Sequence, residues 1–224
     1  MFLNAYKLYA LAVKQYGAID RPAGDRFPGC EEALVSIVVA AISLEAFINE
    51  FAGIAALLAT LEGAPGWLTT LAEVLNEAEN NRASITSKFQ LAMLVISSKP
   101  FNRSAAPFQD FDLLVNLRNE IVHLKPHETV EETQEGDFIT REPKIVKRLA
   151  GTGALGTHPL LEEAISAGHA VSSNWIDRVS TKAMSRWACN AAAGIVKGLM
   201  NALPTSVFRD RALNAFQGFE TIND

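Results

Sequence analysis

The stretch from Leu34 to Leu61 is the most hydrophobic part of the chain and restricts the possible fold more than any other feature. Two glutamates precede it, and acidic residues near a helix N-terminus complement the helix dipole. Glu45 and Asn49 are among the polar residues that interrupt it, well short of the roughly 18 uninterrupted apolar residues of a typical membrane span. We therefore predict a helix from Glu31 to about Leu61 that is buried at the centre of a protein.

Most of the remaining chain also has a helical period. Helices are predicted over about 2–16, 67–79, 84–98, 107–124, 175–203 and 205–217. Pro107 suits the first turn of its helix, and Pro126 follows the end of that helix. The fold class predicted is all-α, an up-and-down helical bundle with a long central helix. A chain of 224 residues fits a single domain over 1–224 with a sizeable core.

The segment 127–173 departs from this pattern, because it begins acidic and turns basic. Within it, "FITREPKIV" (138–146) is read as a short strand or an extended arm. "GTGALGTH" (151–158) is rich in glycine but lacks the Lys-Ser/Thr ending of a phosphate-binding P-loop. We expect one irregular insertion, a surface or mobile arm between two core helices.

The composition narrows the class of function. The 20 Lys and Arg against 25 Asp and Glu give a net charge of −5, which argues against a general nucleic-acid coat protein but leaves room for a local basic cleft. Two cysteines make neither a disulfide framework nor a zinc cluster, and no His-Glu-x-x-His is present. The N-terminus lacks the layout of a secretion signal. We expect no metal, no cofactor, no membrane association and a cytoplasmic location.

The stretch "LRNEIVHLKP" (117–126) places an arginine and a histidine near the end of a predicted helix. On a helical wheel, Arg118 falls inside the apolar arc, whereas Asn119 and His123 are four residues apart on the polar side. Arg118 and His123 are separated by about 140°, so one helix alone does not aim both at one target. Two copies of the helix facing each other would do so.

A buried arginine is costly unless it is paired. Glu45 and Asn49 fall on one stripe of the long helix, which we predict to be a packing face. Glu45 is the expected partner of Arg118, with Lys88 as a rival partner for Glu45. A buried Arg–Glu pair that serves only as scaffold would explain these features equally well. A histidine at a helix C-terminus is also common, because its charge suits the dipole.

The motif "LLVNLRNEIVHLKP" resembles the signature of the HEPN superfamily, an Arg followed by a polar residue and, after four to six positions, a His. "AISLEAFINEF" resembles helix two of prokaryotic HEPN-like proteins. The resemblance covers roughly 30–126 and the last long helix, but not 127–173. It implies a helical bundle of a superfamily in which many members are metal-independent endoribonucleases that work as dimers, often as toxins or in phage defence.

By that resemblance, Arg118 and His123 are the catalytic pair and Asn119 supports them. Glu45 and Asn49 are expected to orient the site. Lys88 and Lys125 are added as candidate substrate contacts. The partners implied are RNA, a second copy of the chain and an antitoxin or a nucleotidyltransferase.

The residues suit RNA cleavage without metal, because a neutral imidazole can take the proton of the 2′-OH and an arginine fork can bind the phosphate as charge builds on it. A second hypothesis stays open: a catalytically silent HEPN-like module that binds a protein, a nucleotide or RNA. The acidic net charge favours the silent module, and the intact Arg-Asn…His set favours the enzyme.

Overall fold

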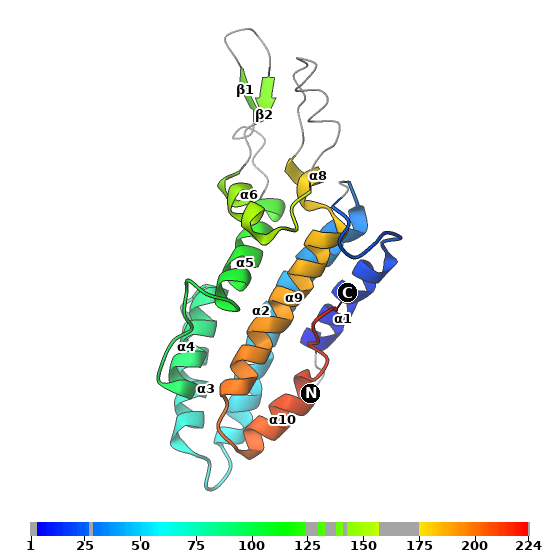
Figure 1. Ribbon diagram of the computed structural model, residues 1–224. Coiled ribbons are helices and arrows are strands. Elements are labelled where there is room, and N and C mark those ends of the chain that lie inside the picture. Colours follow the sequence, from blue (N-terminus) through cyan, green and yellow to red (C-terminus); the bar gives the residue numbers. More distant parts are fainter. Residues whose placement is uncertain are drawn as a thin grey trace.

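The computed structural model describes residues 4–26, 29–123, 130–132, 138–140, 143–156 and 175–223, and it confirms the predicted all-α helical bundle (Figure 1). The helices are α1 (Asn4–Ala18), α2 (Glu31–Ala59), α3 (Gly66–Asn80), α4 (Ile85–Ser97), α5 (Phe108–Val122), α6 (Lys144–Leu149), α8 (Trp175–Val179), α9 (Lys182–Ala202) and α10 (Val207–Phe216). A short 3₁₀ helix, η2 (Ala150–Thr152), follows α6.

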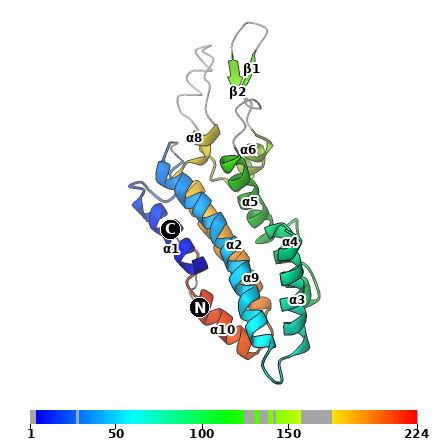
Figure 2. The same cartoon turned by 180° about the vertical axis from the view of Figure 1, so that it is seen from behind.

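The long helix α2 lies at the centre of the bundle, as predicted. It packs against α1, α3, α4, α5, α9 and α10. Figures 1 and 2 show α2 and α9 side by side, with α3, α4 and α5 on one side of them and α1 and α10 on the other. The buried ring of Phe47 on α2 contacts Phe89 of α4 and Phe216 of α10, which joins both sides of the bundle through one side chain.

Among the described helices, α2 is the one whose length and composition would also be sufficient to cross a membrane. In the structure, 50% of its most apolar window is buried inside the bundle. The core helix of a soluble protein passes the same test of length and composition, so this finding is weak evidence for a span.

The helix predicted over 175–203 is divided in two by Ser180 and Thr181. The Ser180 hydroxyl donates to the carbonyl oxygen of Ile176 at 2.8 Å, and the Thr181 hydroxyl oxygen accepts from the backbone N–H of Met184 at 3.1 Å. Thr181 is therefore the N-cap of α9, a position that favours threonine. The apolar period continues across this break, which is why the pattern alone predicted a single helix.

The described parts of 127–173 contain a short hairpin and a helix. Strands β1 (Val130–Glu132) and β2 (Phe138–Thr140) pair antiparallel, so the prediction of a short strand at 138–140 is confirmed. The prediction of an extended arm is wrong for Lys144–Leu149, which is helix α6. Its buried residues Ile145, Val146 and Leu149 join the main core, and α6 packs on α5. The segments 133–137 and 157–174 lie outside the described residues.

Candidate functional site

The Arg-Asn…His motif occupies the last turns of α5, at the end of the bundle where α6 and α8 lie (Figure 1). His123 is the C-cap residue, and its backbone N–H donates to the carbonyl oxygen of Asn119 at 2.9 Å. The side chains of Asn119 and His123 are exposed, and that of Arg118 is half-buried. The structure therefore presents all three side chains at an accessible helix end.

The guanidinium group of Arg118 is hydrogen-bonded to the side-chain amide of Asn119. Its Nη1 donates to Oδ1 of Asn119 at 3.0 Å. No described aspartate or glutamate forms an ion pair with it. A guanidinium that is bonded to a neutral group keeps its charge available for an anion, and it presents several N–H donors in one plane.

The predicted Glu45–Arg118 pair is wrong. Glu45 is exposed on α2, and Arg118 is half-buried. Toward its C-terminal end the apolar arc of α5 is only partly covered, because Ile121 is half-buried and Val122 is 50% exposed, although Leu117 is fully buried. Arg118 therefore borders solvent and needs no buried carboxylate.

The stripe of α2 that carries Glu45 and Asn49 is the open side of the helix, which corrects its assignment to a packing face. Both residues are exposed, and Ala56 on the same stripe is exposed as well. The residues of α2 itself are apolar on nearly every side of the helix, so its hydrophobic periodicity is too weak to identify the buried side.

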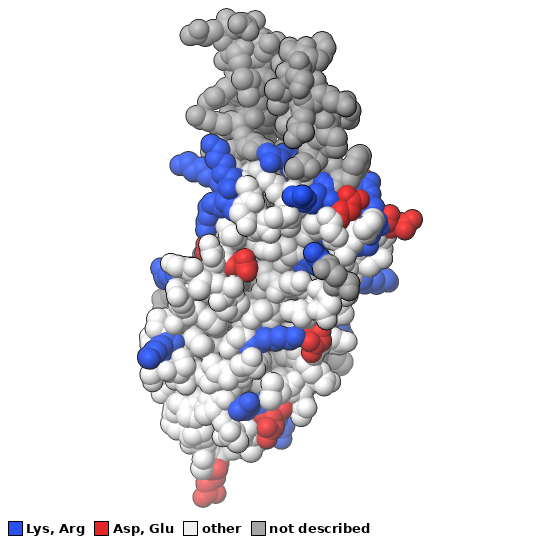
Figure 3. Space-filling view, in the orientation of Figure 1, with Lys and Arg blue, Asp and Glu red and all other residues white. Residues whose placement is uncertain are grey.

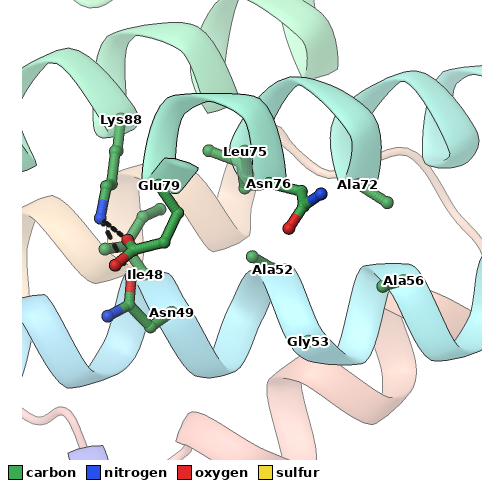
Figure 4. A pocket seen from close by; sticks show the side chains of 10 residues that line it. All are labelled: Ile48, Asn49, Ala52, Gly53, Ala56, Ala72, Leu75, Asn76, Glu79 and Lys88. Atoms are coloured by element: carbon green, nitrogen blue, oxygen red, sulfur yellow. Dashed lines mark hydrogen bonds and ion pairs between the residues drawn. The ribbon is translucent and has the colours of Figure 1, made fainter. Parts of the chain in front are cut away.

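Lys88 is paired with Glu79 of α3, and not with Glu45. The Lys88 ammonium forms an ion pair with the Glu79 carboxylate and also donates to Oδ1 of Asn49 at 3.3 Å (Figure 4). The Lys88 side chain is 8% exposed, whereas that of Glu79 is 57% exposed. The sequence contained a signal for this pair, since opposite charges stand on either side of the turn that joins α3 to α4.

Asn49, Glu79 and Lys88 lie at one end of a cavity of about 340 Å³ between α2, α3 and α4. Asn76 points toward α2 in this cavity, and Ala52 and other small residues of α2 line it (Figure 4). This place is separate from the motif. Phe89, next to Lys88, contacts Phe111 in the first turn of α5, about two turns before Arg118. The predicted site residues therefore divide between two locations.

Lys125, the other candidate substrate contact, lies outside the described residues, as do His127, His158 and His169. In the part of the chain that the structure describes, no three His, Cys, Asp or Glu side chains are grouped so that they could hold a metal ion.

Neither cysteine is an activated nucleophile. Cys189 is fully buried, and this burial raises the pKa of its thiol to about 11. Burial also raises the pKa of Cys30, and its hydrogen bond to Glu32 acts in the same direction. Both thiols are therefore protonated at neutral pH, which leaves the α5 motif as the stronger chemical candidate.

Comparisons with models of protein families, with curated proteins and with solved structures found no match to this chain.

Lysine and arginine side chains crowd the end of the molecule that carries the motif (Figure 3). Lys144, Lys147 and Arg148 come from α6, and Arg148 bridges to Asp112 of α5 with Nη2 and Oδ2 3.2 Å apart. These three cations belong to the part of 127–173 whose sequence turns basic. Their gathering gives an acidic protein a locally basic end.

Because Lys88 is buried and paired, we expect the substitutions Lys88→Met and Glu79→Gln to be coupled. A double-mutant cycle in urea denaturation should give an interaction free energy of about 1 kcal/mol, since Glu79 is partly solvated. The matched cycle of Glu45→Gln with Arg118→Met should be additive within about 0.5 kcal/mol. Coupling in the second cycle, or additivity in the first, would contradict the arrangement of α2, α3, α4 and α5 described here.

Proposed function

We propose that this protein is a metal-independent endoribonuclease of the HEPN type. The observation that carries the proposal is the accessible end of α5, where Arg118, Asn119 and His123 lie together and the guanidinium is bonded to an amide. The basic end of the bundle supports it further, because an RNA backbone is attracted to gathered cations.

The chemistry follows from these groups. The neutral imidazole of His123 takes the proton of a ribose 2′-OH, and the resulting oxygen attacks the adjacent phosphorus. The bond from phosphorus to the 5′-oxygen breaks, and that oxygen takes up a proton. Arg118 binds the non-bridging oxygens as their charge increases. The products are a 2′,3′-cyclic phosphate and a free 5′-hydroxyl.

Asn119 positions Arg118 in this proposal. Its Oδ1 already accepts from the guanidinium, so its amide N–H groups are the donors that remain for a phosphate oxygen. Asn119 and His123 are one helical turn apart on the same edge of α5, so both can reach the same phosphodiester.

The proposed site is completed by a second copy of the chain. Arg118 and His123 diverge by about 140° around α5, so two facing α5 helices bring a pair of each residue to one cleft. Val122, 50% exposed, and the half-buried Ile121 lie beside the motif as apolar surface for such a contact. An antitoxin or a nucleotidyltransferase as partner and a cytoplasmic location belong to the same proposal.

The test is cleavage of a labelled RNA in EDTA by the purified protein. We expect fragments that end in a 2′,3′-cyclic phosphate, identified by mass spectrometry, and no cleavage of the same oligonucleotide with 2′-deoxyribose throughout. Light scattering should give twice the 24.3 kDa of one chain. RNA that is bound but never cut would favour the silent binding module, and cleavage that stops in EDTA would contradict the mechanism.

A further inference from the structure

Helix α6 has two chemically distinct sides. Its three apolar residues fall within about 100° of one another around the helix axis, and all three are buried in the main core. Its three cations fall within about 100° on the opposite side, and all three are exposed. They are Lys144, Lys147 and Arg148. The buried side holds α6 on the bundle, and the exposed side is wholly basic.

An ion pair holds α6 against the helix that carries the motif. Nη2 of Arg148 lies 3.2 Å from Oδ2 of Asp112 on α5, and the same oxygen accepts from Nδ2 of Asn116 at 3.1 Å. Helix α6 also packs directly on α5. Arg148 therefore positions α6, and its charge compensates that of Asp112 where the two helices meet.

The polar edge of α5 connects this contact to the motif. Four polar residues follow one another along α5 at spacings of four, three and four positions, which places them in one line on the helix surface. They are Asp112, Asn116, Asn119 and His123. At a rise of 1.5 Å per residue, Asp112 and His123 are about 16 Å apart along the axis. An extended polymer that touches α6 and follows this edge therefore reaches the imidazole.

The two lysines of α6 are available for an external anion. Their ammonium groups form no hydrogen bond or ion pair within the residues that the structure describes. Lys144 stands in the first turn of α6, where the helix dipole disfavours a cation, so its charge does not stabilise the helix. In the last two turns of α5, Glu120 is the one acidic residue, and Arg118 balances it in charge. The two lysines therefore remain as net positive charge beside the motif.

We propose that α6 is the RNA-binding element of this protein, with Lys144 and Lys147 on the phosphates of a strand that continues along the polar edge of α5 to His123. This inference rests on the proposed function, because the motif supplies the reason for RNA as the anion. An ammonium is a point charge that binds phosphate without reading bases, so these contacts give affinity without sequence preference. The cations gathered at this end in Figure 3 agree with such a path.

A membrane surface is the other anionic partner that a basic helix could meet. Helices that lie on membranes insert apolar side chains between the lipids. Helix α6 has none to insert, because Ile145, Val146 and Leu149 are all buried in the main core. Contacts to RNA phosphates need no apolar side chain, so the two-sided character of α6 favours RNA over a lipid surface.

The experiment measures binding apart from cleavage. Fluorescence polarisation uses short labelled 2′-O-methyl oligonucleotides, either oligouridine or oligoadenosine, which have no 2′-OH to attack. The α6 double variant carries Lys144→Gln and Lys147→Gln. The matched control carries Lys14→Gln and Lys99→Gln, because both lysines are exposed, lie outside α6 and change the net charge by the same amount. Thermal denaturation checks that each variant is folded.

We expect the α6 double variant to bind both oligonucleotides about 10-fold more weakly, and the slope of log K against log salt to decrease in magnitude by about 1.4, because two contacts to single-stranded phosphates are lost. The control should bind as the wild type does. A variant with Lys144→Arg and Lys147→Arg keeps both charges and should also bind normally. In the cleavage assay, the α6 double variant should raise KM and leave kcat nearly unchanged, since these contacts are remote from the reacting phosphate.

The proposal is overturned if the α6 double variant binds RNA as the wild type does, if the control weakens binding equally, or if the wild type binds no RNA. Sedimentation with vesicles of phosphatidylserine and phosphatidylcholine tests the lipid surface, and lysine-dependent binding to vesicles alone also overturns it. Lysine-dependent RNA binding by a wild type that cleaves no RNA would support the role of α6 while the proposed function fails. Cleavage that requires His123, with KM and binding unchanged in the α6 double variant, would support the proposed function and overturn the role of α6.

Discussion

Replacing His123 with Ala is expected to reduce RNA cleavage by at least about 100-fold, the usual contribution of a general base, and to leave the thermal midpoint unchanged. The imidazole is exposed, and the hydrogen bond that His123 makes within α5 comes from its backbone N–H, which the substitution keeps. Single-turnover cleavage and thermal denaturation of the same preparations separate the two effects. Glu120→Ala, an exposed neighbour on α5, is the matched control and should retain activity.

Arg118 gives a complementary result in the same assay. Arg118→Ala should also abolish cleavage, and Arg118→Lys should recover little, because an ammonium lacks the planar fork of donors. Mixing the Arg118→Ala and His123→Ala proteins should restore part of the activity if subunits exchange and the site combines residues of two chains. A His123→Ala protein that cleaves RNA as fast as the wild type would refute the catalytic assignment.

The sequence alone was sufficient to predict the central helix of the fold, because a long apolar helix can be buried in only a few arrangements of the other helices. The 28 residues from Leu34 to Leu61 had to be covered on most sides, and α2 is covered by six other helices. The break at Thr181 was not predicted, since a capping hydroxyl inside a continuous apolar period leaves the period intact. Helix α6 was missed because the charges around it concealed Ile145, Val146 and Leu149.

The sequence predicts the part of the candidate site that lies within one helix. It does not predict the contacts that depend on how separate helices pack together. Arg118, Asn119 and His123 belong to one helix, so their spacing in the sequence determines where they lie relative to one another on that helix. Glu45 was assigned to a packing face because α2 is apolar on nearly all sides, and only the positions of α3 and α4 show which side is open. The Lys88–Glu79 pair and the Arg148–Asp112 pair join separate segments that no helical period relates.

Phe47 is the residue whose loss should destabilise the bundle most. It is fully buried, and its ring lies 4.6 to 5.8 Å, between centroids, from four other phenylalanine rings. These rings belong to Phe51, Phe89, Phe216 and Phe219. Truncation to Ala leaves a cavity at the point where α2, α4, α10 and the C-terminal segment meet.

We expect Phe47→Ala to lower the free energy of unfolding by about 3–5 kcal/mol, because the lost transfer free energy and the cavity term add. Leu57→Ala on the same helix, with a side chain 62% exposed, should change it by less than about 0.5 kcal/mol. Urea denaturation followed by circular dichroism measures both. Equal effects at the two positions would mean that α2 is not buried along the side that carries Phe47, and the bundle described here would have to be rearranged around it.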